Sequence, residues 1–567
     1  METFAFIVGR LEHYVWSFGI PVGEETIPLL VIALLGTGLF LAIRLGFPQI
    51  RHLGHGFAVA SGRYDDPAEP GDVSHFQALT TALSATVGIG NIAGVALAIH
   101  WGGPGAMFWM WVTAVLGMGL KYAEVTLAQR YRQVEGEDRD AHKWEGTVSG
   151  GPMYYIERGL GMRWKPLAIF FAGALMLTSF LTGNGVQANT VADAVNAQFG
   201  VPMWVTGLAT ATVVAAVILG GISRIGKVTG VLAPLMAAIY VAGAAAILLI
   251  HAGSILPTFG LIFREAFDPS AGVAGTGVGA FLVTMMWGIR RGLFSNEAGQ
   301  GSAPIAHAAA KTDEPVSEGV VALLEPFIDT IVICSMTGLV ILATGVWDDR
   351  FPTELALSGG DSSYVEVADS GRMHSTAAPA EIVVRDGVQA TGPQYAWHEV
   401  AVDRLFVDPD HDMPFDGILY AAEGRAVSGD GTQYNVLYGE AAESGAPLTQ
   451  QAFRRGLAPL GDWGHYVVIL SVMLFGISTA ISWSYYGDRC AHYLFGRNAI
   501  LPYKVIFVVM HFVGSVTSLA FIWVLGDVAL GMVTFPNLLA VVLLSGVVAQ
   551  MTKSYFERKP WLTQPRK

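Results

Sequence analysis

Charged side chains are scarce in this sequence of 567 residues: only 14% are Asp, Glu, Lys or Arg, whereas 52% are hydrophobic. An ordinary soluble protein has about 25% charged residues. Apolar runs of about 20 residues, long enough to cross a bilayer, recur along nearly the whole chain. The shortage of charge therefore excludes an ordinary soluble protein and predicts an all-α polytopic membrane protein.

Cysteine is scarce, and the N-terminus is not basic. The only two cysteines, Cys334 and Cys490, lie in or beside apolar runs without metal-ligand spacing, which favours a packing role. Glu2 and Glu12 stand where a signal peptide would be positive. We expect residues 1–26 to form an interfacial amphipathic segment. Its apolar residues at helical spacing are Phe4, Ile7, Leu11, Tyr14 and Phe18.

The apolar runs predict eleven membrane spans, with one leading span followed by two halves of five. Spans 2–6 and 7–11 form the two halves, and the basic tail 552–567 follows the last span. The expected spans are 27–44, 75–99, 105–128, 166–190, 203–221, 228–251, 276–305, 318–345, 463–487, 499–524 and 527–551.

The distribution of basic residues predicts the orientation of these spans. Lys and Arg number 21 in the segments that lie on one side, whereas the short segments on the other side carry only Arg10 and Arg264. Cytoplasmic loops hold the excess of Lys and Arg. We therefore expect a multi-pass protein of a bacterial cell (inner) membrane, with the N-terminus outside and the C-terminus in the cytoplasm.

Residues 346–460 interrupt the apolar pattern and divide the membrane core into 27–345 and 461–551. Between 348 and 455 there are 18 acidic and 7 basic residues and no lysine. Short β-like runs separated by turn clusters predict a small β-rich insert on the extracytoplasmic side. It is either a soluble decoration that shields an outer loop or a domain that captures substrate or a partner. The runs are 381–384, 400–402, 417–420 and 434–438.

The uncharged stretch 80–98 is the segment around which we expect the rest of the chain to be arranged. Gly88, Gly90 and Asn91 lie in its middle, and glycine costs roughly 1 kcal/mol against alanine inside a helix. In lipid, broken backbone is tolerated only where protein or a cavity supplies partners. A helix that breaks at mid-membrane offers half-helix ends that hold a carboxylate and a small cation. The stretch therefore predicts a binding site.

A second break is expected at the matching position of the other half, because such proteins are built from inverted repeats. The matching span is 276–305, and Gly288 and Gly292 lie near its middle. The alternative is that these two glycines only allow neighbouring helices to pack closely.

Four phrases resemble the alanine/glycine:cation symporter family, over about residues 20–345 and 460–550. They are 88–94 (GIGNIAG), 150–156 (GGPMYYI), 292–299 (GLFSNEAG) and 483–487 (WSYYG). The resemblance implies the leucine-transporter-like fold, a 5+5 inverted repeat, and import of alanine or glycine coupled to Na⁺, sometimes H⁺. The acidic insert departs from the family pattern.

The resemblance also implies where the substrate binds. Its carboxylate would meet backbone N–H groups at the first break, and its ammonium would meet backbone carbonyls at the second, since neither break contains an acidic residue. Asn91 would join the site, cap the outer half-helix or do both, and Gln187 would either contact substrate or bond a neighbouring helix. The expected substrate-binding residues are Thr86, Gly88, Ile89, Gly90, Asn91, Gln187, Trp287, Gly288, Ile289 and Trp483.

By the same resemblance, Na⁺ would lie between the first broken helix and the span 463–487. Carbonyls of Ser84 and Val87 and hydroxyls of Ser478 and Thr479 would hold it. The alternative is that these hydroxyls bond carbonyls of their own helix.

Charges inside the spans need partners, because an unpaired buried charge is costly. We expect at least one Arg–carboxylate pair with a structural or gating role. The candidates are Arg290, Arg291, Glu297, Glu325 and Asp329.

These features exclude several classes of protein. The spans contain no nucleophile–base pair or metal cluster, so we expect no enzyme and no organic cofactor, and nothing indicates nucleic-acid binding. A channel would need a continuous polar pore. The remaining alternatives are a symporter of the same fold for another small neutral amino acid and a transport-dead amino-acid receptor.

Overall fold

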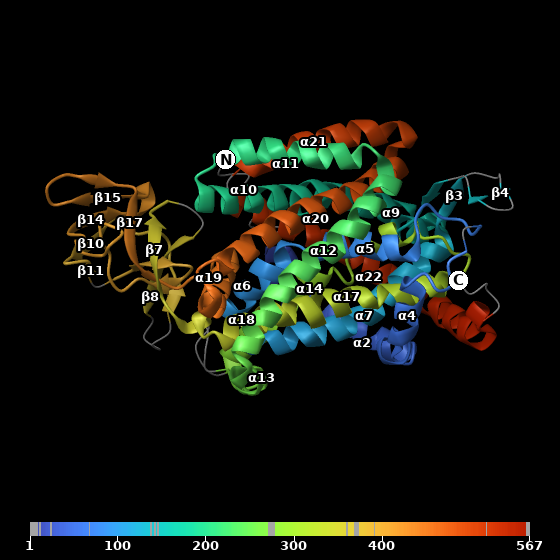
Figure 1. Cartoon of the computed structure of the whole chain (residues 1–567), viewed down its shortest axis with the longest axis horizontal. Helices are drawn as coiled ribbons and strands as arrows, with labels where there is room; N and C mark the ends of the chain where they lie inside the picture. The colour runs from blue at the N-terminus through green and yellow to red at the C-terminus, as the bar shows by residue number, and fades with distance from the viewer. Residues whose placement is uncertain are drawn as a thin grey trace.

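The computed structural model describes residues 10, 13–22, 25–66, 68–135, 139–140, 143–144, 147–269, 278–358, 361–367, 373–390, 392–517 and 519–562. The helices form one body, and a β module of residues 351–441 lies at one end of its long axis (Figure 1). The main helices are α2 (Leu29–Arg44), α4 (Leu53–Ala60), α5 (His75–Thr86), η2 (Gly90–Gly94), α6 (Val95–Gly102), α7 (Ala106–Tyr131), α8 (Pro152–Gly159), α9 (Lys165–Phe180), η4 (Leu181–Gly185), α10 (Val186–Phe199), α11 (Met203–Ile218), α12 (Gly221–Ile250), α13 (Ala252–Glu265), α14 (Val278–Asn296), α15 (Ala303–His307), α16 (Pro315–Ala322), α17 (Leu324–Pro326), η5 (Phe327–Cys334), α18 (Ser335–Ala343), α19 (Gly445–Leu457), α20 (Gly464–Phe495), α21 (Ile500–Val516) and α22 (Leu519–Arg558).

Among the described residues, six helical segments are long and apolar enough to cross a membrane, and a bent pair brings the number to seven. The chain is therefore a multi-pass membrane protein, whereas the count of eleven spans and the inverted repeat stay predictions. The six segments are Met162–Phe199, Gly221–Ile250, Pro315–Ala343, Gly464–Phe495, Arg497–Val516 and Val528–Leu562.

The bent pair is the span predicted to break. Ser74 caps the start of α5 in a reciprocal capping box with Gln77. The helix ends at Thr86, and Val87 leaves the helical region with ψ 88°. Helix resumes at Gly90, and the axes on the two sides differ by 54°. The break predicted within residues 86–91 is confirmed.

The second break is not where the glycines suggested, and that prediction is wrong. Helix α14 runs without interruption through Gly288 and Gly292 to Asn296. A Cβ at Gly288 would lie 2.3 Å from the carbonyl oxygen of Ala106 in α7, so this glycine permits close packing. The helix ends two turns later, where Glu297 (φ 54°), Gly299 (φ 86°) and Gly301 (φ 76°) adopt left-handed backbone.

The N-terminal segment is only partly described. Phe4, Ile7 and Leu11 of the predicted amphipathic helix lie outside the described residues. The following residues form an antiparallel hairpin of β1 (Gly19–Val22) and β2 (Glu25–Pro28), instead of a continued helix.

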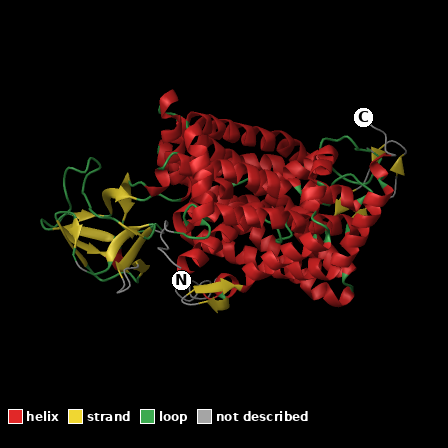
Figure 2. Ribbon diagram, turned by 90° about the horizontal axis from the view of Figure 1, so that it is seen from below, coloured by secondary structure: helices red, strands yellow, loops and turns green. Residues whose placement is uncertain are grey.

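The β module has its own apolar core and only antiparallel strand pairs (Figure 2). One sheet has the order β11-β10-β14-β15-β16, a second has the order β13-β12-β8-β9, and β17 pairs with β7. At its contact with the helices, the ring Nε2 of His100 in α6 lies 2.9 Å from the carbonyl oxygen of His398. The strands are β7 (Phe351–Ala356), β8 (Ser362–Val367), β9 (Met373–Ser375), β10 (Ile382–Arg385), β11 (Val388–Gln389), β12 (Gln394–Trp397), β13 (Val400–Ala401), β14 (Gly417–Tyr420), β15 (Arg425–Ser428), β16 (Gln433–Tyr434) and β17 (Val436–Ala441).

Candidate functional site

A small cavity lies at the break between α5 and η2. The space open to the centre of a water molecule is about 20 Å³, room for about one water. The break supplies one wall, and α10, α20 and the end of α14 supply the others. The lining residues are Ala85, Thr86, Gly88, Ile89, Gly90, Thr182, Gln187, Phe294, Glu297, Thr479, Trp483 and Leu530. Six predicted substrate-binding residues, Thr86, Gly88, Ile89, Gly90, Gln187 and Trp483, are thus brought together.

The two glycines of the break leave the backbone open to this cavity. A Cβ at Gly88 would lie 2.8 Å from the Thr479 hydroxyl and 3.6 Å from Gln187 Oε1. A Cβ at Gly90 would lie 3.1 Å from the ring of Phe294. Side chains at these positions would therefore fill the space in which peptide groups can reach a ligand.

Asn91 stabilises the broken backbone from behind the cavity wall. Its Oδ1 accepts the N–H of Gly88 at 2.8 Å, and its Nδ2 donates to Asp329 Oδ1 at 2.6 Å. The Thr337 hydroxyl donates to its carbonyl at 2.8 Å. Asn91 is completely buried and does not line the cavity. These contacts hold the break together, but Asn91 is not the N-cap of η2, which has no side-chain cap hydrogen bond.

Oxygen atoms from α5 and α20 meet beside the cavity. The Ser84 carbonyl accepts from the hydroxyls of Thr479 at 3.1 Å and Ser478 at 3.4 Å. Ser84 Oγ in turn donates to the Ser478 carbonyl at 3.3 Å. Val87 follows at the end of α5. The four predicted cation ligands therefore come from two adjoining elements, and Thr479 belongs to both the oxygen cluster and the cavity wall.

Two buried polar side chains, Gln187 and Glu297, line the cavity. Gln187 Nε2 donates to the Thr182 carbonyl at 3.2 Å, while its Oε1 has no hydrogen-bond partner among the described residues. Glu297 accepts from Trp483 Nε1 at 3.1 Å and from the Ser302 hydroxyl. The expectation that no acidic residue lies at a break is wrong, because the second break begins at Glu297.

Trp287, Gly288 and Ile289 do not line this cavity. Their peptide groups belong to the continuous helix α14, so the predicted half-helix carbonyls do not exist there. Trp287 instead stacks on Trp101 with ring centroids 5.5 Å apart, and Ile289 is completely buried.

The charged residues that were candidates for Arg–carboxylate pairs contact different partners. Glu325 accepts from Lys121 Nζ at 3.1 Å, and Asp329 accepts from Asn91 and from Ser295 Oγ at 2.7 Å. Arg290 lies over the ring of Trp16 at 4.9 Å. Arg291 lies over Trp287 at 5.2 Å. Sequence reasoning missed Lys121, although it lies with Glu124 inside the predicted span 105–128.

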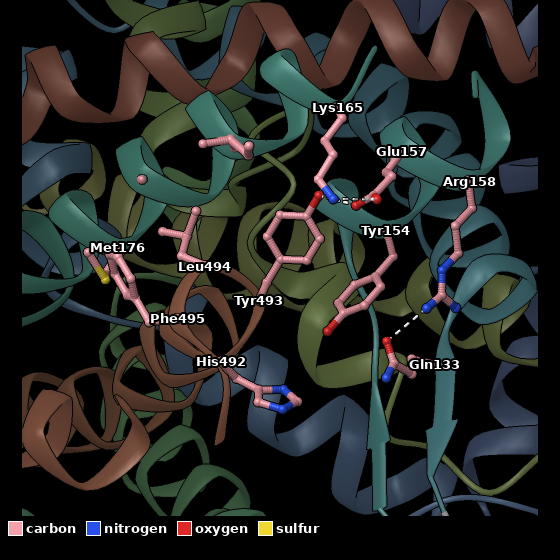
Figure 3. A pocket seen from close by; sticks show the side chains of 12 residues that line it. Gln133, Tyr154, Glu157, Arg158, Lys165, Met176, His492, Tyr493, Leu494 and Phe495 are labelled. Atoms are coloured by element: carbon pink, nitrogen blue, oxygen red, sulfur yellow. Dashed lines mark hydrogen bonds and ion pairs between the residues drawn. The ribbon is translucent and has the colours of Figure 1, made fainter. Parts of the chain in front are cut away.

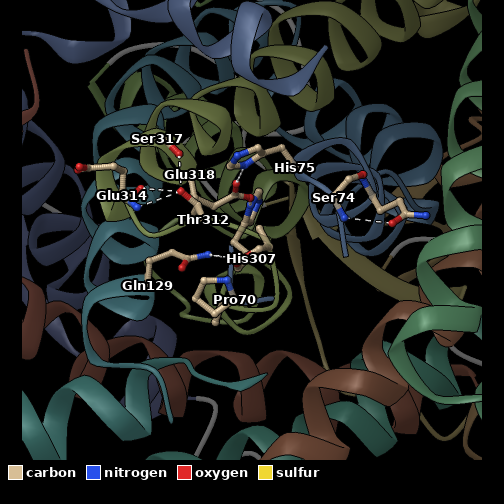
Figure 4. Close-up of polar contacts among 12 residues, drawn as sticks. Pro70, Ser74, His75, Gln129, His307, Thr312, Glu314, Ser317 and Glu318 are labelled. Carbon is tan, nitrogen blue, oxygen red and sulfur yellow. Dashed lines mark hydrogen bonds and ion pairs between the residues drawn. The ribbon is translucent and has the colours of Figure 1, made fainter. Parts of the chain in front are cut away.

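Sequence reasoning also missed a buried polar chain that continues from Glu325. His307 Nε2 lies 2.6 Å from Glu325 Oε1, and its Nδ1 contacts Glu318, which also contacts His75 (Figure 4). All these side chains are almost completely buried. The chain links the start of α5 with α15, α16, α17 and α7, so it ties the first half of the broken span to the segment after the second break. The available signal was a histidine at the edge of each of two predicted spans, His75 at the start of 75–99 and His307 just after 276–305.

Comparison with known proteins identifies the relatives of this chain. The model of the sodium:alanine symporter family matches residues 12–362 and 432–566, and leaves residues 363–431 of the β module unmatched. A sodium/alanine symporter of Methanococcus maripaludis is 38% identical over 558 residues, which cover 98% of each chain. A putative sodium/proton-dependent alanine carrier protein of Bacillus subtilis is 30% identical over 98% of this chain and 93% of the relative.

Among solved structures, MhsT in complex with L-phenylalanine matches 85% of this chain and 98% of that chain, with 12% identity and a TM-score of 0.46. A likeness of that degree leaves the inverted repeat a prediction. The family match and the identity to whole-length relatives are sufficient for the family itself. The chain belongs to the sodium:alanine symporter family.

Proposed function

We propose that the protein imports alanine, glycine or both together with Na⁺ by alternating access. The observation that carries this proposal is the cavity at the first break, where backbone, an amide, a hydroxyl and an indole converge on a space of about 20 Å³ that must widen to admit a substrate. The names of the relatives support sodium and alanine as the transported species. The cavity is small, which favours small substrates.

The substrate lies across the break in this proposal. Its carboxylate meets the N–H groups of Ile89 and Gly90, at the positive end of the outer half-helix. Its ammonium faces the Oε1 of Gln187, the buried acceptor described above. The carboxylate of Glu297 adds negative charge on that side. The ring of Trp483 closes the cavity and limits the size of the substrate side chain.

Na⁺ occupies the oxygen cluster of Ser84, Val87, Ser478 and Thr479 in this proposal. Its entry would replace the weak hydrogen bonds that now join these oxygens at 3.1–3.4 Å. Na⁺ that moves inward contributes roughly 2.3 kcal/mol per charge for each 100 mV. Because Thr479 and Gly88 lie side by side, binding of the cation orders the same backbone that binds the carboxylate, and this couples the two ligands.

The proposed orientation has the N-terminus and the β module outside and the C-terminus in the cytoplasm of a bacterial-type cell membrane. The β module and the end of α22 lie at opposite ends of the long axis, which supports this orientation (Figures 1 and 2). Residues 346–460 then form an outer domain between 27–345 and 461–551.

Uptake of radiolabelled L-alanine into proteoliposomes tests the proposal. We expect an inward Na⁺ gradient to drive accumulation, and excess glycine to compete. Equal uptake with and without the gradient would reject coupling to Na⁺, and a matching pH gradient then tests H⁺. Saturable binding without any flux would favour a receptor, and competition by larger neutral amino acids alone would favour a related symporter with another substrate.

A further inference from the structure

A second, larger pocket lies among the ends of α8, α9 and α20, and shares no residue with the cavity at the break. Its volume is about 650 Å³, and it is open on one side. The lining divides into a polar and an apolar wall (Figure 3). The polar wall consists of Gln133, Tyr154, Glu157, Arg158, Lys165, His492 and Tyr493, and the apolar wall consists of Ile169, Gly173, Met176, Leu494 and Phe495.

The apolar wall continues onto the outer face of the protein. Ile169 is 46% exposed and Phe495 is 69% exposed. Beyond the pocket rim on α9, Phe170 and Leu177 are also about half exposed. Helix α9 belongs to one of the membrane-spanning segments, so these side chains face the bilayer. The pocket therefore opens sideways towards lipid rather than towards the transport path.

The polar wall carries more positive than negative side chains. Lys165 pairs with Glu157 at 3.2 Å, and Tyr493 also donates to this carboxylate. No carboxylate accepts a hydrogen bond from Arg158 among the described contacts. Its guanidinium is held by the carbonyls of Tyr131 and Arg132 and by Gln133 Oε1, the last at 2.8 Å. These three neutral acceptors position the cation at the pocket and leave its charge in place.

We propose that this pocket binds an anionic glycerophospholipid of the inner leaflet. The phosphate lies between Arg158 and Lys165, and an acyl chain runs along Ile169, Gly173 and Phe495. Basic pockets between helices at the cytoplasmic side are suited to anionic headgroups, and the volume is that of a small-molecule site. The assignment to the inner leaflet rests on the orientation given under the proposed function.

Such a lipid would brace two helices that reach the transport site. Helix α9 leads through η4 to Gln187, and α20 carries Thr479 and Trp483. The ends of both helices line the pocket. A bound lipid therefore stabilises the relative position of the two helices, and we expect the folded protein to be more stable when anionic lipid is present.

The test is thermal unfolding of the full chain in nanodiscs of phosphatidylcholine with or without phosphatidylglycerol, together with native mass spectrometry of bound lipid. Nanodiscs expose both leaflets and need no transport, so the result is independent of the orientation and of the proposed function. We expect phosphatidylglycerol to raise the unfolding temperature of the wild type. The double variant Arg158→Gln/Lys165→Gln should lose more than half of that increase.

Two further variants complete the design. Gly173→Phe should also remove the increase by filling the apolar wall, and a Cβ at Gly173 meets no atom within 4 Å, so the protein should fold. Arg163→Gln, an exposed neighbour outside the pocket, is the matched control and should respond as the wild type does. Equal increases in all variants would overturn the proposal. An equal increase with inorganic phosphate would identify a soluble anion instead of a lipid.

Discussion

Two glycine pairs, Gly88/Gly90 and Gly288/Gly292, look alike in the sequence but differ in the structure. The helix breaks at the first pair and continues through the second. The neighbours explain the difference. The nearest atom to a Cβ at Gly88 is the end of a side chain, Thr479 Oγ1, whereas at Gly288 it is a backbone carbonyl. The first pair opens a space for a ligand, and the second lets two helices approach.

The variant Gly288→Ala should have the largest effect on the folded protein. Its Cβ would lie 2.3 Å from the Ala106 carbonyl and 2.6 Å from Trp109 Cβ, so α7 and α14 must separate. Overpacking of a core typically costs about 1–3 kcal/mol, and we expect the upper end because backbone cannot move aside. Thermal unfolding in detergent measures this, with Gly173→Ala as an unstrained control. A wild-type unfolding temperature would show that the contact with α7 is not tight.

The variant Asn91→Ala should abolish uptake while the protein stays folded. Without the amide, the Gly88 N–H and Asp329 lose the partner that joins them across the break. Uptake and gel filtration of the purified variant give the two readouts. Normal transport by this variant would remove Asn91 from the account of the site.

The variant Gly88→Ala should keep the fold and lower uptake by about tenfold, equivalent to about 1.4 kcal/mol. The added methyl group projects into the cavity, and the Thr479 hydroxyl can rotate away from it. The unfolding temperature should therefore fall much less than for Gly288→Ala. Similar losses of stability in the two variants would mean that the glycine pairs do not differ in role.

The variant Thr479→Ala should have the smallest effect and act mainly on the cation. We expect the Na⁺ concentration needed for half-maximal uptake to rise by about fivefold, the equivalent of about 1 kcal/mol for one hydrogen-bonding group. The alanine requirement should rise less. Ser471→Ala is the matched control, because that hydroxyl bonds only its own helix at Val467 among the described contacts. Equal changes in both requirements would argue against a cation role.

The sequence was sufficient to predict that the chain is a membrane protein, which family it belongs to and where the first helix break lies. Three strands of the β module, β10, β13 and β14, also coincide within a residue with predicted runs. The sequence could not locate the second break, because the spacing between two glycines does not reveal which backbone of a neighbouring helix packs against them. The chain from His75 to Lys121 was missed for a similar reason, since its five members come from five elements and two of them, His75 and Lys121, lie far in sequence from the other three.

The most direct test is a structure determined with L-alanine and Na⁺ bound. Alanine should lie at residues 88–90, with its carboxylate on the N–H groups of Ile89 and Gly90 and its methyl group against Trp483, and Na⁺ should lie among Ser84, Ser478 and Thr479. Alanine bound beside Trp287 and Ile289, with the first break unoccupied, would contradict the account.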